Sequence, residues 1–467
     1  AEFMERRAKR EGIALAVRKR VKNAQSGLYE GYEKKRGALL ELCEYFLEGK
    51  DNFRKKVNLA RGYEAVIILD EDSFTSDASR LCAVMNHPLN RGYAVAALCG
   101  KPYLASRYKN TFTALFGCGG GIDAYGECSV KFERDVLMCA NYTGKGYFRV
   151  REFYERVGAE VRDNTVLSHD YIEGAFAGTL VTDCAVLEDF PDGYGKYEAR
   201  RLRWLRGDVQ LLPYLAPKIT KKDGSRAANP LNLTQKRHIA VNIAAAFVPL
   251  SLLACVIRAA IFPHAALIAA ICLCVFHPAA EMLTQLKDRP SEFMLSILRS
   301  LIGLSLLAYR AVADVYTALL GAARLLKRKN LMQWQTFSHS KGSKIYVVLS
   351  LIAAVISVGV FIITLKTGFL VCAVIFACAL LVPGMTPSCR EKEKKQLGAD
   401  FIKNTLKDTW RYFSDRLEKG EALISDNCRI KTDAYYARRT SPTNIGFSLV
   451  AILCAYINNF IGRDTFD

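Results

Sequence analysis

Short segments of this sequence carry the residue types that bind phosphates and move protons. Asp70 and Asp72 follow an apolar run, Asp170 follows a Ser-His pair, and an arginine-rich segment from Arg200 to Arg206 contains Trp204. Carboxylates together with substrate phosphates are the usual environment of Mg²⁺. A carboxylate can also take a proton from a hydroxyl group, and guanidinium groups bind phosphate oxygens. The segments therefore predict an enzyme that uses an activated, phosphorylated donor.

Sugar transfer from a nucleotide sugar needs each of these groups. A cation must neutralise the leaving diphosphate, and we expect Asp70 and Asp72 to bind it. A base must deprotonate the acceptor hydroxyl, and Asp170 fits that role. Positive and aromatic groups must hold the phosphate and the sugar faces, and Arg203 and Trp204 fit those roles.

Each segment also has a structural interpretation, which taken singly is the commoner one. The acidic turn can be a helix N-cap at Asp72, and Ser168 or Asp170 can cap another helix. A run of arginines is usually a solvated helix face, and Trp204 can belong to an ordinary core. The occurrence of all the segments in this order, next to long apolar runs, favours the chemical interpretation.

Alternating helix and strand signals surround these residues. We predict a helix over Lys34–Leu47 and strands over Tyr63–Leu69 and Tyr93–Leu98. The alternation favours a mostly parallel sheet with helices on both faces. Asp70 then lies beyond the carboxyl end of a strand, where ligands collect in open α/β sheets. Thr143–Gly146 is predicted to bring backbone N–H groups near a ligand, or to be only a tight turn.

The two ends of this α/β region differ in charge and hydropathy. Residues 2–22 carry eight Lys/Arg and three Glu, which predicts a basic helix over residues 1–30, solvated rather than anchored on a membrane. After Pro217, four apolar runs follow. A bilayer span needs about 20 such residues, so residues 218–386 are predicted to contain about four spans: Ile239–Ile257, Ile261–Ala280, Ile345–Leu365 and Gly368–Met385.

A further apolar segment, Phe293–Leu320, contains Arg299, Arg310 and Asp314. These charges favour a cytoplasmic interfacial helix near residues 293–320, with a fifth span as the alternative.

Charge placement predicts the orientation of the chain in a membrane. The net charge is +19, and basic residues concentrate in 217–237, 324–344 and 387–395, outside the short turns between paired spans. By the positive-inside rule, the α/β domain, the middle segment and the tail are cytoplasmic. Anionic lipid accounts for much of the basic charge, and no long groove of interleaved basic and aromatic residues indicates nucleic acid. The 15 Cys include no CxxC pair, which indicates reduced structural thiols.

Several stretches resemble the glycosyltransferase module of cyclic β-1,2-glucan synthases. The RxxRW and LSHD motifs are also similar to the QxxRW and catalytic-aspartate motifs of processive inverting glycosyltransferases of the GT-A fold, such as cellulose synthase. Arg200 stands where that motif has Gln. The stretches that carry the resemblance are KKRGALLEL (34–42), ILDEDS (68–73), NHPLNR (86–91), TGKGYFRV (143–150), LSHDYIEGAFAG (167–178), RWLRGDVQLLPY (203–214), LMQWQT (331–336) and RRTSPTNIG (438–446).

The resemblance implies a GT-A-like domain over residues 31–217 of a multi-pass enzyme of the bacterial inner membrane. It implies transfer of glucose from UDP-glucose to a growing β-1,2-glucan by inversion, with Mg²⁺ or Mn²⁺ as cofactor. The matching motif positions make Asp170 the catalytic base, and Asp70 and Asp72 the diphosphate and metal ligands. They make Arg203 and Trp204 donor- and acceptor-binding residues, and Arg200 and Lys145 are placed with them.

The resemblance also raises two expectations about the ends of the chain. GT-A domains of this family begin with strands that bind uracil and ribose, and we expect none in residues 1–30. The first half of the domain is then incomplete, and the full protein has further amino- or carboxy-terminal domains. Residues 387–467 are expected to form a cytoplasmic helical linker and the start of a following carbohydrate-active domain. The alternatives are another polysaccharide synthase of the cellulose or hyaluronan type, and a non-catalytic membrane remnant or subunit.

Overall fold

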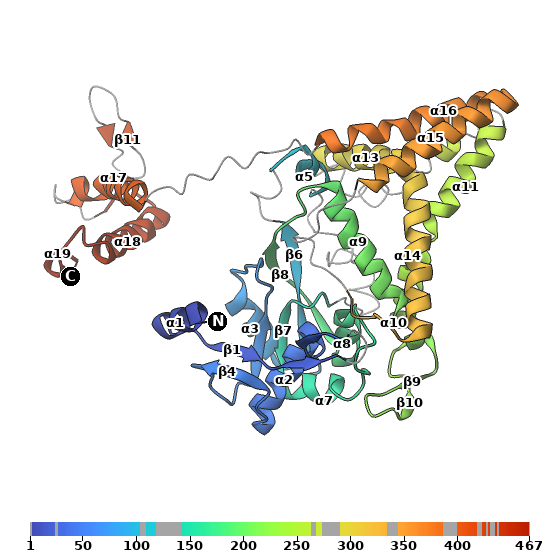
Figure 1. The fold of residues 1–467 in the computed structure, drawn as a ribbon. Coiled ribbons are helices and arrows are strands. Elements are labelled where there is room, and N and C mark those ends of the chain that lie inside the picture. Colours follow the sequence, from blue (N-terminus) through green and yellow to red (C-terminus); the bar gives the residue numbers. More distant parts are fainter. Residues whose placement is uncertain are drawn as a thin grey trace. The chain divides into compact units, whose positions relative to one another are not determined.

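The computed structural model divides the 467-residue chain into two compact units, residues 1–387 and 388–467 (Figure 1). The first unit contains an α/β part and a helical part, and the second is a small helical unit. The structure describes residues 2–23, 27–102, 109–117, 142–262, 268–272, 290–333, 344–385, 399–417, 423–425, 428–429, 435–436 and 439–466.

A four-stranded sheet forms the centre of the α/β part, in the order β5–β7–β6–β8. β5 and β6 both pair antiparallel with β7, whereas β6 pairs parallel with β8. The expectation of a mostly parallel sheet is therefore wrong for the pairing, although β5, β6 and β8 run in one direction. Helix and strand signals alternate in the same way whichever direction a strand takes, so they do not reveal the reversed β7. The strands are β5 (Ala65–Ile68), β6 (Val95–Pro102), β7 (Gly146–Arg149) and β8 (Thr179–Glu188).

Both faces of this sheet are covered by helices, as the sequence predicts. Val95 and Phe148 belong to a core formed with helices α2, α7 and α8, whereas their neighbours Ala96 and Tyr147 pack with Leu81 on the other face. Neighbouring strand residues point to opposite faces, so each strand contributes to both cores. The helices are α2 (Lys34–Glu48), α3 (Ala78–Asn86), α7 (Val150–Val157) and α8 (His169–Ala177).

The predicted basic helix over residues 1–30 is wrong beyond its first turns. Helix α1 ends at Glu11, and Gly12 follows with φ +65, a conformation that favours glycine and ends helices. Strands follow, so the expectation that no strands precede the Lys34 helix is also wrong. Five consecutive apolar residues, 13–17, open this segment, and a short apolar run after a turn glycine is consistent with a strand even though basic residues follow it. The elements are α1 (Glu2–Glu11), β1 (Leu15–Arg18), β2 (Arg20–Lys22) and β3 (Tyr29–Gly31); β1 pairs with β4 (Phe53–Val57), and β2 pairs with β3.

Two helices in the described residues are long and apolar enough to cross a membrane, Ile345–Thr364 and Thr367–Met385. They confirm two of the predicted spans. Two bent helix pairs pass the same test only when each pair is taken as one span, which gives two to four candidate spans. The predicted run Ile261–Ala280 lies largely outside the described residues. The helices concerned are α10 (Leu233–Ala245), α11 (Val248–Ile261), α13 (Pro290–Ser305), α14 (Leu307–Lys327), α15 (Ile345–Thr364) and α16 (Thr367–Ala377).

Both bends have local causes. The predicted span Ile239–Ile257 is broken by 46° where Pro249 lies in the first turn of α11, because proline lacks the N–H that a continuous helix would need. The single interfacial helix predicted near residues 293–320 is instead two helices at 74°. Gly303 and Ser305 lie at this bend, and such Gly/Ser pairs are common sites of sharp kinks.

The charges of helix α14 contact helix α9 (Tyr194–Val209). The Arg201 guanidinium binds the buried carboxylate of Asp314 with an Nη1–Oδ2 distance of 2.9 Å, and Arg310 Nε donates to the Tyr194 hydroxyl at 3.1 Å. Apolar contacts between Val209 and residues of α14 extend this interface. Two of the three charges that suggested an amphipathic surface helix therefore hold α14 against α9.

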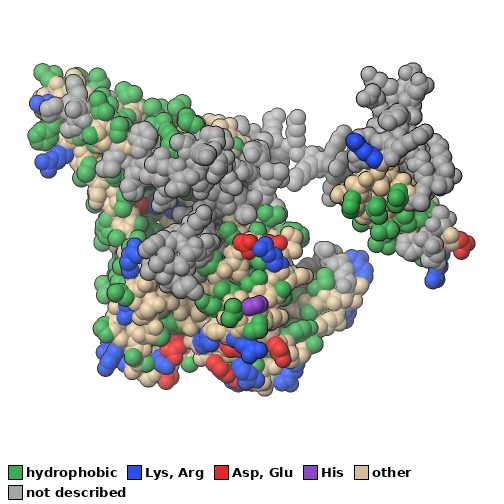
Figure 2. Space-filling view, turned by 180° about the vertical axis from the view of Figure 1, so that it is seen from behind, with side chains coloured by type: hydrophobic (Ala, Val, Ile, Leu, Met, Phe, Trp, Pro, Cys, Tyr) green, Lys and Arg blue, Asp and Glu red, His purple; other side chains and the backbone are tan. Residues whose placement is uncertain are grey.

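The far end of the helical part is apolar on its surface. Figure 2 shows hydrophobic side chains gathered over α11, α15 and α16, while charged side chains gather at the opposite end of this unit. An exterior that is apolar apart from the Lys/Arg visible at its tip fits a lipid environment. The exposed apolar residues of α15 and α16 include Val348, Ile352, Val355, Ile356, Ile362, Ile363, Leu370, Val371 and Val374.

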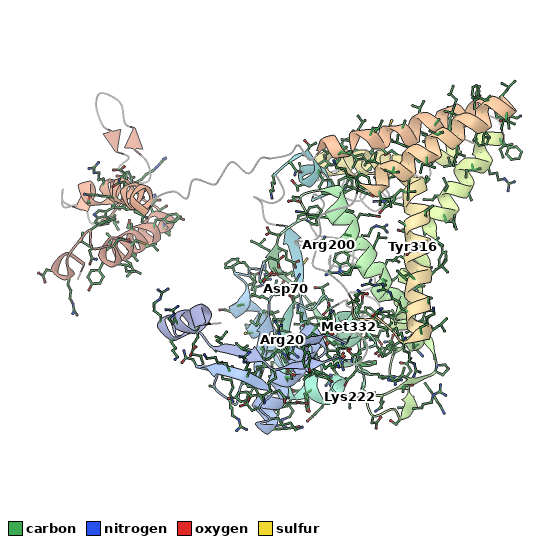
Figure 3. The ribbon with its side chains drawn as sticks, in the orientation of Figure 1. Arg20, Asp70, Arg200, Lys222, Tyr316 and Met332 are labelled. Carbon is green, nitrogen blue, oxygen red and sulfur yellow. The ribbon has the colours of Figure 1, made fainter. Side chains whose placement is uncertain are left out.

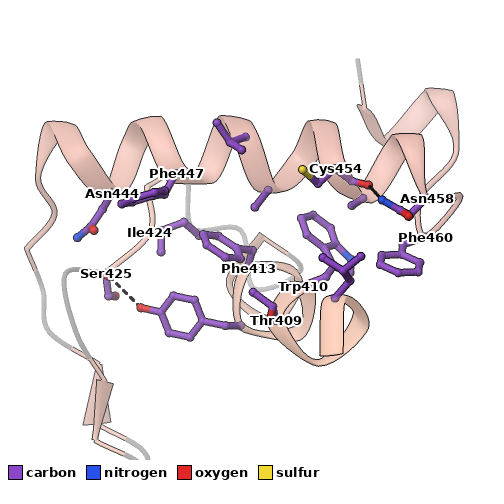
Figure 4. Close-up of a pocket in the computed structure, with 15 residues that line it drawn as sticks. Thr409, Trp410, Phe413, Ile424, Ser425, Asn444, Phe447, Cys454, Asn458 and Phe460 are labelled. Atoms are coloured by element: carbon purple, nitrogen blue, oxygen red, sulfur yellow. Dashed lines mark hydrogen bonds between the residues drawn. The ribbon is translucent and has the colours of Figure 1, made fainter. Parts of the chain in front are cut away.

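The second unit packs helix α17 (Ala399–Leu417) against α18 (Pro442–Ile457). Trp410, Phe413 and Phe447 line a largely apolar cavity of about 390 Å³ between them, where the Tyr412 hydroxyl donates to the Ser425 carbonyl at 2.9 Å (Figure 4). The remaining short elements of the two units are α5 (Thr111–Phe116), β9 (Lys218–Thr220), β10 (Arg226–Ala228), β11 (Cys428–Arg429), β12 (Tyr435–Tyr436) and α19 (Arg463–Phe466).

Candidate active site

Asp70 lies just beyond the carboxyl end of β5, at the end of the sheet that faces α9 (Figure 3). Its two oxygens contact two lysines from different elements: Oδ1 is 2.6 Å from Lys35 Nζ on α2, and Oδ2 is 3.5 Å from Lys145 Nζ. Lys145 also pairs with Glu188 at 2.5 Å. Burial would raise the pKa of Asp70, but the two lysines outweigh it and lower this pKa below its usual value. Asp70 is thus an ionised carboxylate held between two cations.

Glycine is needed on either side of Lys145, because neighbouring atoms leave no room for a side chain. A Cβ on Gly146 would lie 2.0 Å from the Ala96 carbonyl oxygen, because β7 enters close against β6. Gly144 has φ +76, and a Cβ there would lie 2.3 Å from Asp170 Oδ1. The turn predicted at Thr143–Gly146 therefore brings backbone directly against the Asp170 carboxylate.

Asp170 lies in the first turn of α8, with its side chain about one-third exposed. The preceding Ser168 is at the N-cap position but makes no side-chain capping hydrogen bond, so capping through Ser168 does not account for this segment. A Cβ on Gly207 would lie 2.0 Å from Ser168 Oγ, and the Leu167 N–H donates to Gln210 Oε1 at 2.8 Å. The start of α8 is therefore held directly on α9.

Helix α9 presents an arginine–tryptophan stack to this region. The Arg200 guanidinium lies over the Trp204 ring at 4.7 Å and over the Phe190 ring at 5.6 Å, and Arg200 is only 5% exposed. Arg200 is therefore a buried cation–π partner, which rules out the solvated-face interpretation at this position.

Arg203 links α9 electrostatically to both carboxylates. Burial and then repulsion from Arg200 lower the pKa of Arg203, while the charges of Asp170 and Asp70 oppose that change. Lys35 has the same two partners: burial would lower its pKa, but Asp170 and Asp70 raise it. Lys35 and Arg203 thus lie within electrostatic range of both Asp70 and Asp170, from two different helices.

Backbone carbonyls of Leu331–Gln333 are held beside this region by three polar side chains. Gln210 Nε2 donates to the Leu331 carbonyl at 3.0 Å, Lys34 donates to that of Met332, and Arg206 donates to that of Gln333. Figure 3 shows Met332 on the same side of the unit as α9. The rest of the LMQWQT segment, residues 334–336, lies outside the described residues.

The predicted metal ligands differ in their surroundings. Both oxygens of Asp70 already contact lysines, so a cation there must compete with two positive charges. Asp72 is partly exposed and forms no ion pair with any residue in the described ranges. Asp72 therefore differs from Asp70 in having no lysine at its carboxylate among the described residues.

A second cluster lies behind Asp170. His169 Nδ1 is 3.2 Å from Asp170 Oδ1 and 3.1 Å from Glu173 Oε2, and ligand atoms of the three residues lie within 4.8 Å of one another. Burial would lower the pKa of His169, but the two carboxylates outweigh it and raise this pKa to about 9. In the metal-free cluster the two carboxylates favour a protonated imidazole, so a metal ion would have to displace that proton to bind here.

Sequence comparison gives a related protein but no family assignment. No protein-family model matches the chain. The cyclic beta-(1,2)-glucan synthase NdvB of Rhizobium meliloti (strain 1021) is 26% identical over 509 aligned positions, which cover 96% of this chain. The chain resembles a cyclic β-(1,2)-glucan synthase. It spans 17% of the length of that relative, and the alignment includes both the α/β part and the helical part.

The structure gathers most of the site residues predicted from the sequence. Asp70 contacts Lys145, and Arg203 lies within electrostatic range of Asp70 and Asp170. Arg200 and Trp204 stack on each other, whereas Asp72 has no recorded contact with this group in the described residues. Four charged residues of this region were not predicted from the sequence. Lys35, His169 and Glu173 lie inside the quoted motifs, and Glu188 lies outside them.

Proposed function

We propose that this chain is a membrane-bound glycosyltransferase module that transfers glucose from UDP-glucose to a growing β-1,2-glucan with inversion. The observation that supports it best is the position of Lys35 and Arg203, each within electrostatic range of both Asp70 and Asp170. Cations suited to a diphosphate and a carboxylate suited to a hydroxyl proton thus lie at one site. The resemblance to a cyclic β-(1,2)-glucan synthase supports the class of product.

In this mechanism, Lys35, Lys145 and Arg203 bind the donor diphosphate through charge-assisted hydrogen bonds. Asp170 takes the proton of the acceptor hydroxyl, whose oxygen attacks the anomeric carbon opposite the leaving diphosphate. The new glycosidic bond forms as the bond to the diphosphate breaks, which inverts the configuration and leaves UDP. The same cations stabilise the charge that develops on the leaving group, and Trp204 offers an aromatic face to a sugar.

A divalent cation, Mg²⁺ or Mn²⁺, fits this proposal at Asp72 beside Asp70. It would supply further neutralisation of the leaving diphosphate. Lys35 and Lys145 already balance the charge of Asp70, so these lysines and the cation would together neutralise the leaving diphosphate.

The location that fits this function is the bacterial inner membrane, with the catalytic part in the cytoplasm. The two long apolar helices support membrane insertion. In the sequence, basic residues precede Ile345 and follow Met385, whereas the turn between the two helices contains only Lys366, and the positive-inside rule then puts the outer ends of the pair in the cytoplasm, where UDP-glucose is made available.

Two alternatives differ in what supports them. The expected lack of early strands motivated a non-catalytic remnant, and strands β1–β3 before α2 remove that motive. Another polysaccharide synthase of the cellulose or hyaluronan type would use the same site. Linkage analysis of the product separates it from a β-1,2-glucan synthase.

Binding of UDP and Mg²⁺ tests the donor site without requiring turnover. We expect the thermal midpoint of the detergent-solubilised chain to rise with UDP plus Mg²⁺, because ligand at 100 times its Kd adds about 2.7 kcal/mol to stability. Asp72→Asn should retain part of the UDP effect and lose its magnesium dependence. A chain that UDP and Mg²⁺ leave unshifted would contradict the proposed donor site.

A further inference from the structure

The pair His169–Glu173 has no role in the mechanism above, yet it is among the most deeply buried charge pairs of the α/β part. The two residues are one turn apart on α8, and the Glu173 side chain is 1% exposed. A buried carboxylate is costly unless it is paired. The free-energy cost of burying Glu173 therefore indicates a role beyond packing.

The buried atoms of this cluster have no hydrogen-bond partner of good geometry among the described residues. They are His169 Nδ1, Asp170 Oδ1, both Glu173 oxygens and the Tyr142 hydroxyl. The ion pairs at 3.1 and 3.2 Å are therefore what balances the His169 nitrogen. Both carboxylates lie near the same nitrogen, which carries a single proton, so they stabilise the imidazolium through its charge rather than through one hydrogen bond each.

Other charged groups face this cluster from neighbouring elements. Lys35 and Arg36 of α2 act on Glu173, and Lys35 also acts on His169. The Tyr142 hydroxyl lies within range of Glu173 and Asp170, and burial keeps it neutral by raising its pKa well above the usual value. The two carboxylates outweigh Lys35 at His169, so the imidazole stays protonated.

We propose that Glu173 and His169 are positioning residues for Asp170, in which Glu173 holds a proton on His169 Nδ1 and the resulting imidazolium fixes Asp170 Oδ1. This inference rests on the proposed function, because it assigns Asp170 as the base. Oδ1 is held between the imidazolium and the Gly144 backbone. The other oxygen, Oδ2, which also faces Gly144 at 3.0 Å from a Cβ built there, is the one left to take the proton of the acceptor hydroxyl.

The pH profile of turnover tests this pair, because a merely structural role would not move it. Wild-type turnover should fall above about pH 9, where His169 loses its proton. In Glu173→Gln, this fall should begin at lower pH, because the carboxylate that holds the proton is gone. Glu173→Asp should restore most of the wild-type profile.

His169→Asn should remove this fall in turnover at high pH altogether. Turnover at neutral pH should drop about 10- to 100-fold with an unchanged KM for UDP-glucose, as for a slightly misplaced catalytic group. If the fall in turnover at high pH stays in place in both Glu173→Gln and His169→Asn, the proposal is overturned. If these variants still transfer glucose, the proposed function stands even so.

A second measurement does not depend on turnover. The ring ¹³C signals of the six histidines can be titrated in the full chain, with His169→Asn identifying the signal of His169. We expect a midpoint near 9 that falls in Glu173→Gln. A titration midpoint near 6.5 for His169 overturns the proposal. A His169 signal that Mn²⁺ broadens in wild type but not in Glu173→Gln also overturns it, because the cluster would then hold a metal. If transfer fails but this titration holds, the proposed function alone is wrong.

Discussion

Replacement of Asp170 by Asn is expected to lower glucose transfer from UDP-glucose by about 10²- to 10⁴-fold, the usual loss when a general base is removed. Asparagine has nearly the same shape but cannot take the hydroxyl proton. The side chain is about one-third exposed and lies over Gly144, so the substitution creates neither a cavity nor a clash. Transfer is measured with radiolabelled UDP-glucose in membranes that contain the full chain.

Asp183→Asn is the matched control for this variant. Asp183 is an exposed carboxylate paired with Arg80 on the surface of β8, and surface pairs contribute about 0–1 kcal/mol. We expect its transfer rate to equal that of wild type. Asp170→Asn with the turnover of wild type would show that another group is the base, and equal UDP affinity in both variants would confine the effect to the chemical step.

Gly144→Ala is expected to lower turnover by about 10²-fold, the loss that a misplacement of about 1 Å can cause. The added methyl group would lie 2.3 Å from Asp170 Oδ1, so either the carboxylate or the turn must move. The backbone at Gly144, with φ +76, adds strain of about 1–2 kcal/mol for any other residue. Transfer rate and thermal midpoint are measured together, to separate displacement from destabilisation.

Gly224→Ala provides the control for strain alone. Gly224 has φ +85, close to that of Gly144, but an added Cβ meets no atom within 4 Å. The control should lose a similar amount of stability and retain its turnover. If both variants lose turnover equally, the contact between Gly144 and Asp170 does not position the base.

Elements with strong local patterns were predictable from the sequence. The helix expected over Lys34–Leu47 is observed over Lys34–Glu48, and the span expected over Ile345–Leu365 is observed over Ile345–Thr364. In both, periodicity or length alone distinguishes the element, and neighbouring turn residues limit it. The motifs around Asp70 and Asp170 were found for the same reason, because each is a short contiguous segment.

Features that depend on distant contacts were not predictable. The direction of β7 depends on its entry between β5 and β6, which no local pattern encodes. The role of Arg201 depends on Asp314, 113 residues away, and Asp70 meets a lysine 35 residues earlier in the chain. The strands after Gly12 were missed because Lys and Arg make up four of the five residues 18–22, and this charge resembled that of a basic helix.

The contact between α9 and α14 limits how deep the chain can lie in a bilayer. Helix α14 runs beside α9 from Arg310, which contacts Tyr194, to Gly321, which contacts Val209. Helix α9 carries four arginines, whose transfer into hydrocarbon is costly. Residues 310–321 must therefore stay at the depth of α9, outside the hydrocarbon core, and the bent pair of α13 and α14 cannot cross it along its whole length. The boundary of the hydrocarbon core is accordingly expected before Arg310, near the 74° bend.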